Sequence, residues 1–202
     1  MRIGLLGGSF DPVHLGHLWI AESAIETLDL DQLYWIPAAT SPLKPNGPVA
    51  SDALRAEMLR LAISGSDKHS VDCRELSRGD VSYTIDTVEQ LQAEQPDTEF
   101  VLIIGSDSLA SIRKWHEPRR LLQKVVISVV HRGGDPPIDL SVLDGLVTPE
   151  RFAEIERRVL HMPVIEISSS ELRDRIATGR SIRYRVPRSV EALIEANGLY
   201  RD

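Results

Sequence analysis

The chain has 202 residues, about the length of one domain, with 42% hydrophobic and 26% charged residues. This composition is typical of a globular protein and excludes a disordered or fibrous chain. The single cysteine, Cys73, excludes an internal disulfide framework and a cysteine-based zinc cage. A net charge of −7 argues against a nucleic-acid binder. Without an eighteen-residue apolar run or a signal peptide, we expect no membrane partner and a cytoplasmic location.

Apolar runs of strand length alternate with segments of helical spacing. Strands are expected at residues 2–6, 33–37, 71–76, 100–104 and 125–130. Helices are expected from His17 onward and at residues 54–62, 85–91, 169–177 and 188–196, and long loops at 38–51 and 133–149. Trp19 and Trp35, in an apolar helix and an apolar strand, are expected to be buried structural residues.

This alternation predicts an α/β fold, a doubly wound and mainly parallel sheet with helices on both faces. We expect a single domain over residues 1–202, with the C-terminal helical part, from about residue 168 to 202, packed onto the same core. Ligands of such folds usually bind at the carboxyl ends of the strands.

The first loop, residues 7–17, reads Gly-Gly-Ser-Phe-Asp-Pro-Val-His-Leu-Gly-His between a strand and a helix. Glycines and a helix start suit phosphate, because backbone N–H groups approach the ligand closely. His14 and His17, three residues apart, face the same way at a helix start. They could ligate a metal or cap a loop, but phosphate binding uses both histidines and both glycines and is the interpretation we favour.

A second segment near the C-terminus, residues 167–173, reads Ile-Ser-Ser-Ser-Glu-Leu-Arg ahead of a helix. Hydroxyl groups and N–H groups at a helix start, together with the Arg173 guanidinium, again suit phosphate. An ordinary helix N-cap with a solvated Arg173 is the alternative.

These two segments resemble the signatures of the nucleotidyltransferase superfamily that carries a (T/H)xGH element, here residues 14–17. The paired Gly7 and Gly8 and the Phe-Asp-Pro after them resemble the bacterial nicotinate mononucleotide adenylyltransferases. Residues 167–173 are similar to the Ile-Ser-Ser-Thr-x-Ile/Val-Arg element, with Ser170 in place of the usual threonine and Leu172 in place of the β-branched residue. The resemblance implies a Rossmann-like nucleotidyltransferase fold.

The middle of the chain supports the same family. Residues 82–87, Ser-Tyr-Thr-Ile-Asp-Thr, resemble its Ser-Tyr-Thr-x-Asp-Thr element, and residues 105–107 followed by Trp115 resemble its Gly-x-Asp…Trp stretch. Residues 37–44 match its Pro…Pro-His-Lys loop, with Leu43 where histidine is usual. The likeness runs from residue 3 to 200 and is weakest over residues 133–163.

The resemblance assigns the site residues. The catalytic residues are His14, His17 and Arg173. The ATP-binding residues are Gly7, Gly8, Ser9, Phe10, His14, His17, Gly105, Asp107, Ser168, Ser169, Ser170 and Arg173. Nicotinate mononucleotide is assigned to Lys44, Tyr83, Thr84, Trp115 and Arg132. Mg²⁺ is expected to bind mainly through the ATP phosphates, and no protein ligand is assigned to it.

The implied activity is adenylyl transfer from ATP to nicotinate mononucleotide, giving deamido-NAD and pyrophosphate in NAD biosynthesis. Nicotinamide mononucleotide or phosphopantetheine as acceptor, or a non-catalytic nucleotide sensor, are the alternatives. The sequence leaves the oligomeric state open, with a homo-oligomer among the options.

Overall fold

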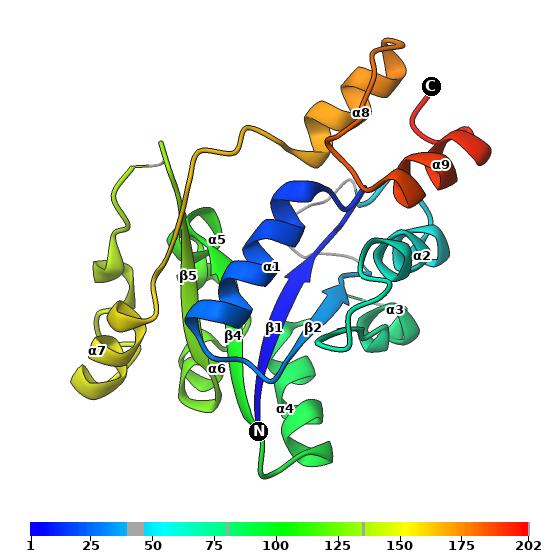
Figure 1. The fold of residues 1–202 in the computed structure, drawn as a ribbon. Coiled ribbons are helices and arrows are strands. Elements are labelled where there is room, and N and C mark those ends of the chain that lie inside the picture. Colours follow the sequence, from blue (N-terminus) through cyan, green and yellow to red (C-terminus); the bar gives the residue numbers. More distant parts are fainter. Residues whose placement is uncertain (40–46, 80, 135, 202) are drawn as a thin grey trace.

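The fold is built on one parallel β-sheet (Figure 1). The computed structural model describes residues 1–39, 47–79, 81–134 and 136–201. Within these residues six strands form a sheet in the order β3-β2-β1-β4-β5-β6. Every neighbouring pair is parallel. The strands are β1 (Arg2–Gly8), β2 (Gln32–Pro37), β3 (His69–Val71), β4 (Glu99–Gly105), β5 (Val126–Arg132) and β6 (Leu160–Met162).

Helices cover both faces of this sheet, as the sequence predicts. One face packs against α1 (Leu15–Thr27), α2 (Asp52–Ala62), α8 (Ser169–Ala177) and α9 (Arg188–Ala196). The other packs against α4 (Thr84–Glu94), α5 (Ser106–Ala110), α6 (Pro118–Lys124) and α7 (Pro149–Arg157). The short α3 (Arg74–Arg78) follows β3, and two 3₁₀ turns are η1 (Ile112–Lys114) and η2 (Leu140–Leu143). The predicted fold class is confirmed.

The topology places a crevice at the carboxyl ends of β1 and β4. These strands are neighbours in the sheet, and the chain winds outward from them in opposite directions, through β2 and β3 on one side and β5 and β6 on the other. Such a reversal leaves a ligand-binding crevice in open α/β sheets. Gly7 and Gly8 end β1, and Gly105 ends β4. The two predicted glycine segments therefore meet at this crevice.

The C-terminal part, residues 168–201, joins the core of the first face. Leu172, Val190 and Tyr200 belong to the same buried cluster as Ile20 and Ile25 of α1. In Figure 1, α8 and α9 lie beyond the end of the sheet toward which β1 points. The C-terminal helices thus lie over the end of the sheet that carries the crevice.

Two predicted features are wrong. The strand expected at 71–76 ends at Val71, because the Asp72 carboxylate accepts a hydrogen bond from the Arg74 amide (2.9 Å) and turns the chain into α3. Trp19 is 52% exposed, whereas Trp35 is fully buried as predicted. The buried face of α1 is formed by Ile20 and its helical neighbours, and Trp19 falls outside that stripe.

The segment at 133–149 was expected to be a loop. It contains the 3₁₀ turn η2, and α7 begins at its last residue, followed by the unpredicted edge strand β6. The apolar signal of these elements is weak, since Leu143 and Ile155 are the fully buried residues that η2 and α7 contribute to the core. Short elements with so few core residues carry no periodic pattern that a sequence window can detect.

The central strand β1 offers a test of the core. Leu5 has no exposed surface, so Leu5→Ala should lower the free energy of unfolding by about 2–5 kcal/mol through lost burial and a cavity. Val81 is 45% exposed, and Val81→Ala should change stability by less than about 0.5 kcal/mol. Urea unfolding of both variants measures the difference. Equal losses in the two variants would contradict the core position of Leu5.

Candidate active site

The loop that follows β1 is shaped by its glycines. A Cβ at Gly8 would lie 3.0 Å from the Phe10 ring, so a side chain there would push against a buried aromatic residue. Among the described residues, a Cβ at Gly7 would meet one atom, the Ile36 carbonyl oxygen at 4.0 Å. Gly8 is therefore required by internal packing, whereas no described side chain fills the space at Gly7. Phe10 itself has φ 47°, an unusual backbone conformation for a non-glycine residue.

The two histidines of the motif form a stacked pair at the start of α1. Their ring centroids lie 3.7 Å apart with an interplanar angle of 23°. The His14 backbone N–H donates to Nδ1 of His17 at 3.3 Å. Nδ1 of a neutral His17 is thus an acceptor, so its proton is on Nε2, where it can serve as a hydrogen-bond donor. A Cβ at Gly16 would lie 3.1 Å from the His14 ring, which explains the glycine between the histidines.

His14 is a buried and neutral imidazole. Burial is the main cause that lowers the pKa of His14 to about 4, and the positive charge of Arg132 lowers it further. Its Nδ1 atom is buried and makes no hydrogen bond within the described part of the chain. A buried polar atom without a partner points to a bound group that completes it. The pair is therefore prepared for an anionic ligand.

The two predicted motifs meet, although they are more than 150 residues apart. Nη1 of Arg173 donates to the main-chain oxygen of Asp11 at 2.7 Å, and the Ser169 hydroxyl donates to that of Pro12 at 2.9 Å. The two segments are in contact, as predicted, and their contribution to one binding site stays a prediction. The Arg173 side chain is 30% exposed, and its bond to Asp11 holds the guanidinium against the first loop, unlike the freely solvated side chain of the alternative interpretation.

The three serines ahead of α8 already have structural partners. Ser168 is the N-cap, and its hydroxyl accepts from the Glu171 amide at 3.1 Å. The Ser170 hydroxyl accepts from Nη2 of Arg173 at 3.3 Å. These contacts orient the helix start and the guanidinium. ATP contacts of Ser168, Ser169 and Ser170 stay a prediction.

Arg132 lies on the histidine side of the crevice. It ends β5 and its charge acts on His14. It lines a small pocket together with His14, Gly16, Ile20, Met162, Pro163, Ile165 and Ile167. Its predicted role in nicotinate mononucleotide binding stays a prediction.

An aromatic group lies at the start of α4. The Tyr83 and His116 rings are stacked, with centroids 4.1 Å apart and an interplanar angle of 27°. Trp115, the neighbour of His116, is half-buried, and its indole N–H donates to the Ser111 hydroxyl at 3.4 Å. Thr84 is the first residue of α4. The structure therefore brings Tyr83, Thr84 and Trp115 together, as predicted, and adds His116.

Asp107 lies in the first turn of α5, directly after β4, and is exposed. Its carboxylate folds back over Gly105, where an added Cβ would lie 2.5 Å from Oδ1. The carboxyl end of a strand is a usual place for ligands in such sheets, and the ATP contact of Asp107 stays a prediction. Lys44, the predicted contact for the acceptor phosphate, lies outside the described residues.

Three further residues that sequence reasoning did not assign hold the site together. Arg55 is fully buried, and its guanidinium donates to the carbonyl oxygens of Ser9 (2.7 Å) and Ala38 (2.8 Å). The Asp11 carboxylate accepts from the Tyr200 hydroxyl at 2.6 Å. No local pattern signals these contacts, because an arginine in an amphipathic helix usually reads as a surface residue. Asp11 stood within the first motif but had no assigned role.

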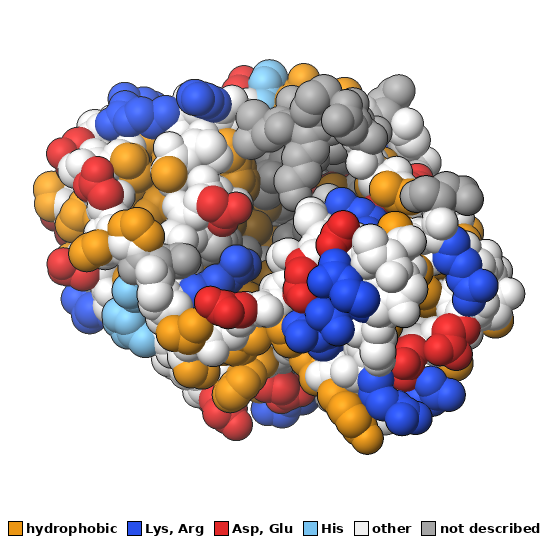
Figure 2. Space-filling model, turned by 90° about the horizontal axis from the view of Figure 1, so that it is seen from above, with side chains coloured by type: hydrophobic (Ala, Val, Ile, Leu, Met, Phe, Trp, Pro, Cys, Tyr) orange, Lys and Arg blue, Asp and Glu red, His pale blue; other side chains and the backbone are white. Residues whose placement is uncertain are grey.

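The residues of this end fit an anion better than a resident metal. Within the described residues no group of three or more His, Cys, Asp or Glu side chains could hold a metal ion. Figure 2 looks onto this end of the molecule and shows Lys and Arg side chains, in blue, interspersed with acidic ones over the middle of the face.

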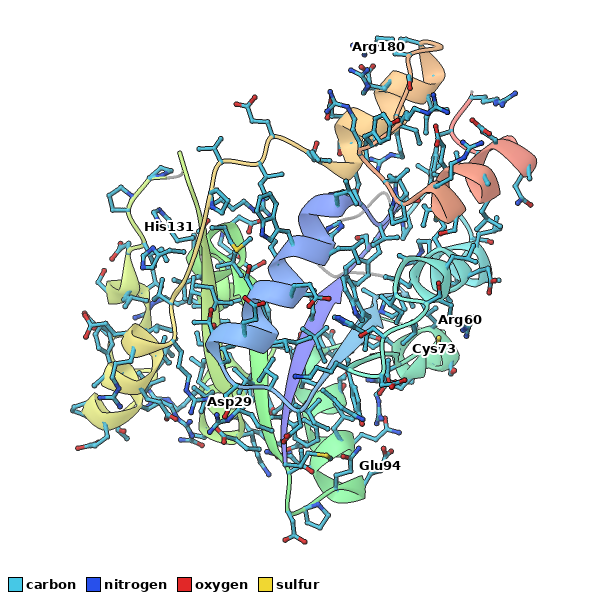
Figure 3. The ribbon with its side chains drawn as sticks, in the orientation of Figure 1. Asp29, Arg60, Cys73, Glu94, His131 and Arg180 are labelled. Carbon is cyan, nitrogen blue, oxygen red and sulfur yellow. The ribbon has the colours of Figure 1, made fainter. Side chains whose placement is uncertain are left out.

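Two further observations concern the single cysteine and the length of the helices. Cys73 lies beside Arg60, whose Nη2 is 3.6 Å from the sulfur, on the side of the molecule distant from His131 of β5 (Figure 3). No helix in the described part of the chain is long and apolar enough to cross a membrane.

Comparison with known proteins identifies the class of protein to which this fold belongs. The cytidylyltransferase-like family model matches residues 5–175. A solved structure titled Plasmodium falciparum nicotinic acid mononucleotide adenylyltransferase complexed with NaAD superimposes with a TM-score of 0.74, at 20% identity, covering 98% of this chain and 97% of that one. The same named protein complexed with APC gives a TM-score of 0.73 at 21% identity, covering 98% and 96%. The chain is thus a nucleotidyltransferase by fold.

Sequence relatives narrow the class further. A protein of Rhodopirellula baltica named "Probable nicotinate-nucleotide adenylyltransferase" is 56% identical over 98% of this chain and 93% of its own length. A protein of the same name from Roseiflexus castenholzii is 46% identical over 99% and 98%. The chain belongs to the nicotinate-nucleotide adenylyltransferase family, as the motifs indicated.

The lowered pKa of His14 makes stability depend on pH. An unfolded chain protonates this histidine below about pH 6.5, whereas the folded protein keeps it neutral down to about pH 4. The unfolded state binds more protons in this range, so the free energy of unfolding falls as pH drops from 6.5 toward 4. Between pH 7 and pH 5 this loss should be about 2 kcal/mol greater in the wild type than in His14→Gln.

Urea unfolding of both proteins at the two pH values measures this difference. An NMR titration of the His14 ring in the folded protein gives an independent check. A midpoint near the ordinary value for histidine would contradict the buried, neutral imidazole.

Proposed function

We propose that this protein transfers the adenylyl group of ATP to the 5′-phosphate of nicotinate mononucleotide. The products are nicotinate adenine dinucleotide and pyrophosphate, which places the reaction in NAD biosynthesis. The observation that carries this proposal is the contact between Arg173 and Asp11, which brings a permanent cation to the histidine pair. Membership of the nicotinate-nucleotide adenylyltransferase family supports the same activity over the whole chain.

The chemistry requires charge neutralisation rather than a base. The acceptor phosphate is already an anion near neutral pH, so its oxygen can attack the α-phosphorus of ATP in line, and pyrophosphate leaves. The barrier is the repulsion between two anions, and preorganised donors lower it. His17 supplies an N–H from Nε2, Arg173 supplies two guanidinium N–H groups, and His14 completes its buried ring against a phosphate oxygen.

The remaining nucleotide contacts surround this centre. The open space above Gly7 admits the phosphates close to the backbone of Gly8 and Ser9. Phe10 holds the His17 ring edge-on at 5.1 Å. We assign the ribose to Asp107 and Gly105, the α8 start, residues 168–170, to the triphosphate, and Arg132 to nicotinate mononucleotide.

The acceptor binds on the other side of the crevice. The backbone N–H groups and the hydroxyl at the start of α4, residues 83–84, are suited to the nicotinate carboxylate. Trp115 offers a face for the electron-poor pyridine ring, and the stacked Tyr83 and His116 form the wall beside it. We assign the acceptor phosphate to Lys44.

Magnesium enters as part of the substrate, MgATP, bound through the phosphates. We place the reaction in the cytoplasm, where ATP and pyridine mononucleotides are made and used.

Removal of the His17 imidazole tests the catalytic centre. His17→Ala should lower kcat by roughly 10²–10³, because a preorganised donor to the transferring group is lost. The exposed His161 of β6 provides the control, and His161→Ala should keep kcat. Pyrophosphate release from ATP and nicotinate mononucleotide is the assay, with circular dichroism to show that both variants are folded. Near-normal turnover in His17→Ala would refute the assigned role.

Acceptor selectivity tests the second half of the site. A site built for an anion leaves its donors poorly paired against an amide, so nicotinate mononucleotide should be strongly preferred over nicotinamide mononucleotide. Thr84→Val removes one donor and should reduce the ratio of the two kcat/KM values about tenfold.

The matched control is Thr98→Val, at the opposite end of the sheet, whose hydroxyl lies 3.5 Å from Oε1 of Gln95. This variant should keep the wild-type ratio. Faster turnover with nicotinamide mononucleotide or phosphopantetheine in the wild type would contradict the assigned acceptor.

A further inference from the structure

The Asp11 carboxylate is a buried charged group that the mechanism above leaves unused. Its side chain is 3% exposed. Its two oxygens accept hydrogen bonds from the Val49 amide (2.7 Å), the Ala50 amide (3.1 Å) and the Tyr200 hydroxyl (2.6 Å). Three segments far apart in the sequence therefore converge on one carboxylate.

Tyr200 brings the end of the chain to this carboxylate. It is 8% exposed and packs in the same cluster as α1 and α9. Its backbone adopts φ 62°, which turns the chain back toward the core after α9. Burial and the hydrogen bond to Asp11 raise the pKa of Tyr200, so its hydroxyl remains a donor at neutral pH.

Asp11 in turn fixes two parts of the site. Nη1 of Arg173 lies 3.8 Å from Oδ2 of Asp11 and donates to the main-chain oxygen of the same residue at 2.7 Å. The amides of Val49 and Ala50 belong to the chain that leads into α2, whose N-cap is Ser51. The carboxylate thus joins the cation of the nucleotide side to the segment that follows the loop after β2.

Stability alone does not explain such a carboxylate. Replacing buried charged pairs by apolar residues of similar volume is often neutral or stabilising. A charged group held by three hydrogen bonds beside a reacting centre is instead suited to fixing geometry, because each partner must lie in one place to satisfy it.

We propose that Tyr200 and Asp11 are positioning residues for adenylyl transfer: Tyr200 holds the Asp11 carboxylate, and Asp11 holds the Arg173 guanidinium. Neither touches substrate. This inference rests on the proposed function, in which Arg173 contacts the ATP phosphates. It means that the last residues of the chain take part in setting the rate of the reaction.

Tyr200→Phe tests this link by removing one hydroxyl group. We expect kcat to fall about tenfold while KM for ATP changes less than about threefold, since a misplaced donor loses transition-state rather than ground-state contact. Tyr34→Phe is the matched control, because its hydroxyl also has one side-chain partner, Gln95 at 3.4 Å, at the opposite end of α4 from Tyr83. This variant should keep kcat within about twofold.

A double-mutant cycle separates positioning from a general loss of stability. If Tyr200 acts through Asp11 on Arg173, the variant Tyr200→Phe/Arg173→Lys should be little slower than Arg173→Lys alone. Independent, multiplying effects would overturn the proposal, as would a Tyr200→Phe enzyme as fast as Tyr34→Phe. Asp11→Asn provides the same cycle through the carboxylate itself, and thermal unfolding of each variant shows that it is folded.

The outcomes distinguish a failure of the proposed function from a failure of the positioning role. A wild-type protein that releases no pyrophosphate from ATP and nicotinate mononucleotide refutes the proposed function. An active wild type whose Tyr200→Phe and Asp11→Asn variants keep full kcat refutes the positioning role only.

Discussion

The site depends on one contact between residues 162 positions apart, the hydrogen bond from the Arg173 guanidinium to the main-chain oxygen of Asp11. It adds a second cation to the loop that carries the histidine pair, beside Arg132, whose charge acts on the neutral His14. The Ser169 hydroxyl donates to the main-chain oxygen of Pro12 in the same loop. Together these bonds hold the start of α8 against the loop after β1, so that the two segments predicted to bind phosphate lie side by side.

The charge of the molecule and the charge of the site differ in sign. The chain carries a net charge of −7, yet the donors at the crevice are imidazole N–H groups, backbone amides and guanidinium groups. Burial keeps His14 neutral, so the permanent positive charge comes from arginine, which cannot lose its proton. An acidic protein can therefore bind a triphosphate because local donors, and not the overall charge, meet the phosphates at short range.

Sequence patterns located the site well where the information is local. The bounds of α8 and α9 agree with the predicted helices, and residues 7–17 connect β1 to α1, as the motif indicated. The pattern could not show Arg55 or the contact between Tyr200 and Asp11, because these contacts link residues 46 and 189 positions apart. It also misplaced Trp19, since an apolar helix does not reveal which stripe faces the sheet.

The two adjacent glycines of the first loop, Gly7 and Gly8, are needed for different structural reasons. A side chain at Gly8 would strike the Phe10 ring, so that glycine serves packing inside the protein. A side chain at Gly7 would find no atom of the described residues closer than 4.0 Å, so that glycine leaves space beside this part of the chain. Gly8 is thus required by packing within the protein, whereas glycine at position 7 leaves space for a ligand. The sequence does not distinguish these two roles, because both positions read as glycine. The space at Gly7 is where the phosphates can approach the backbone.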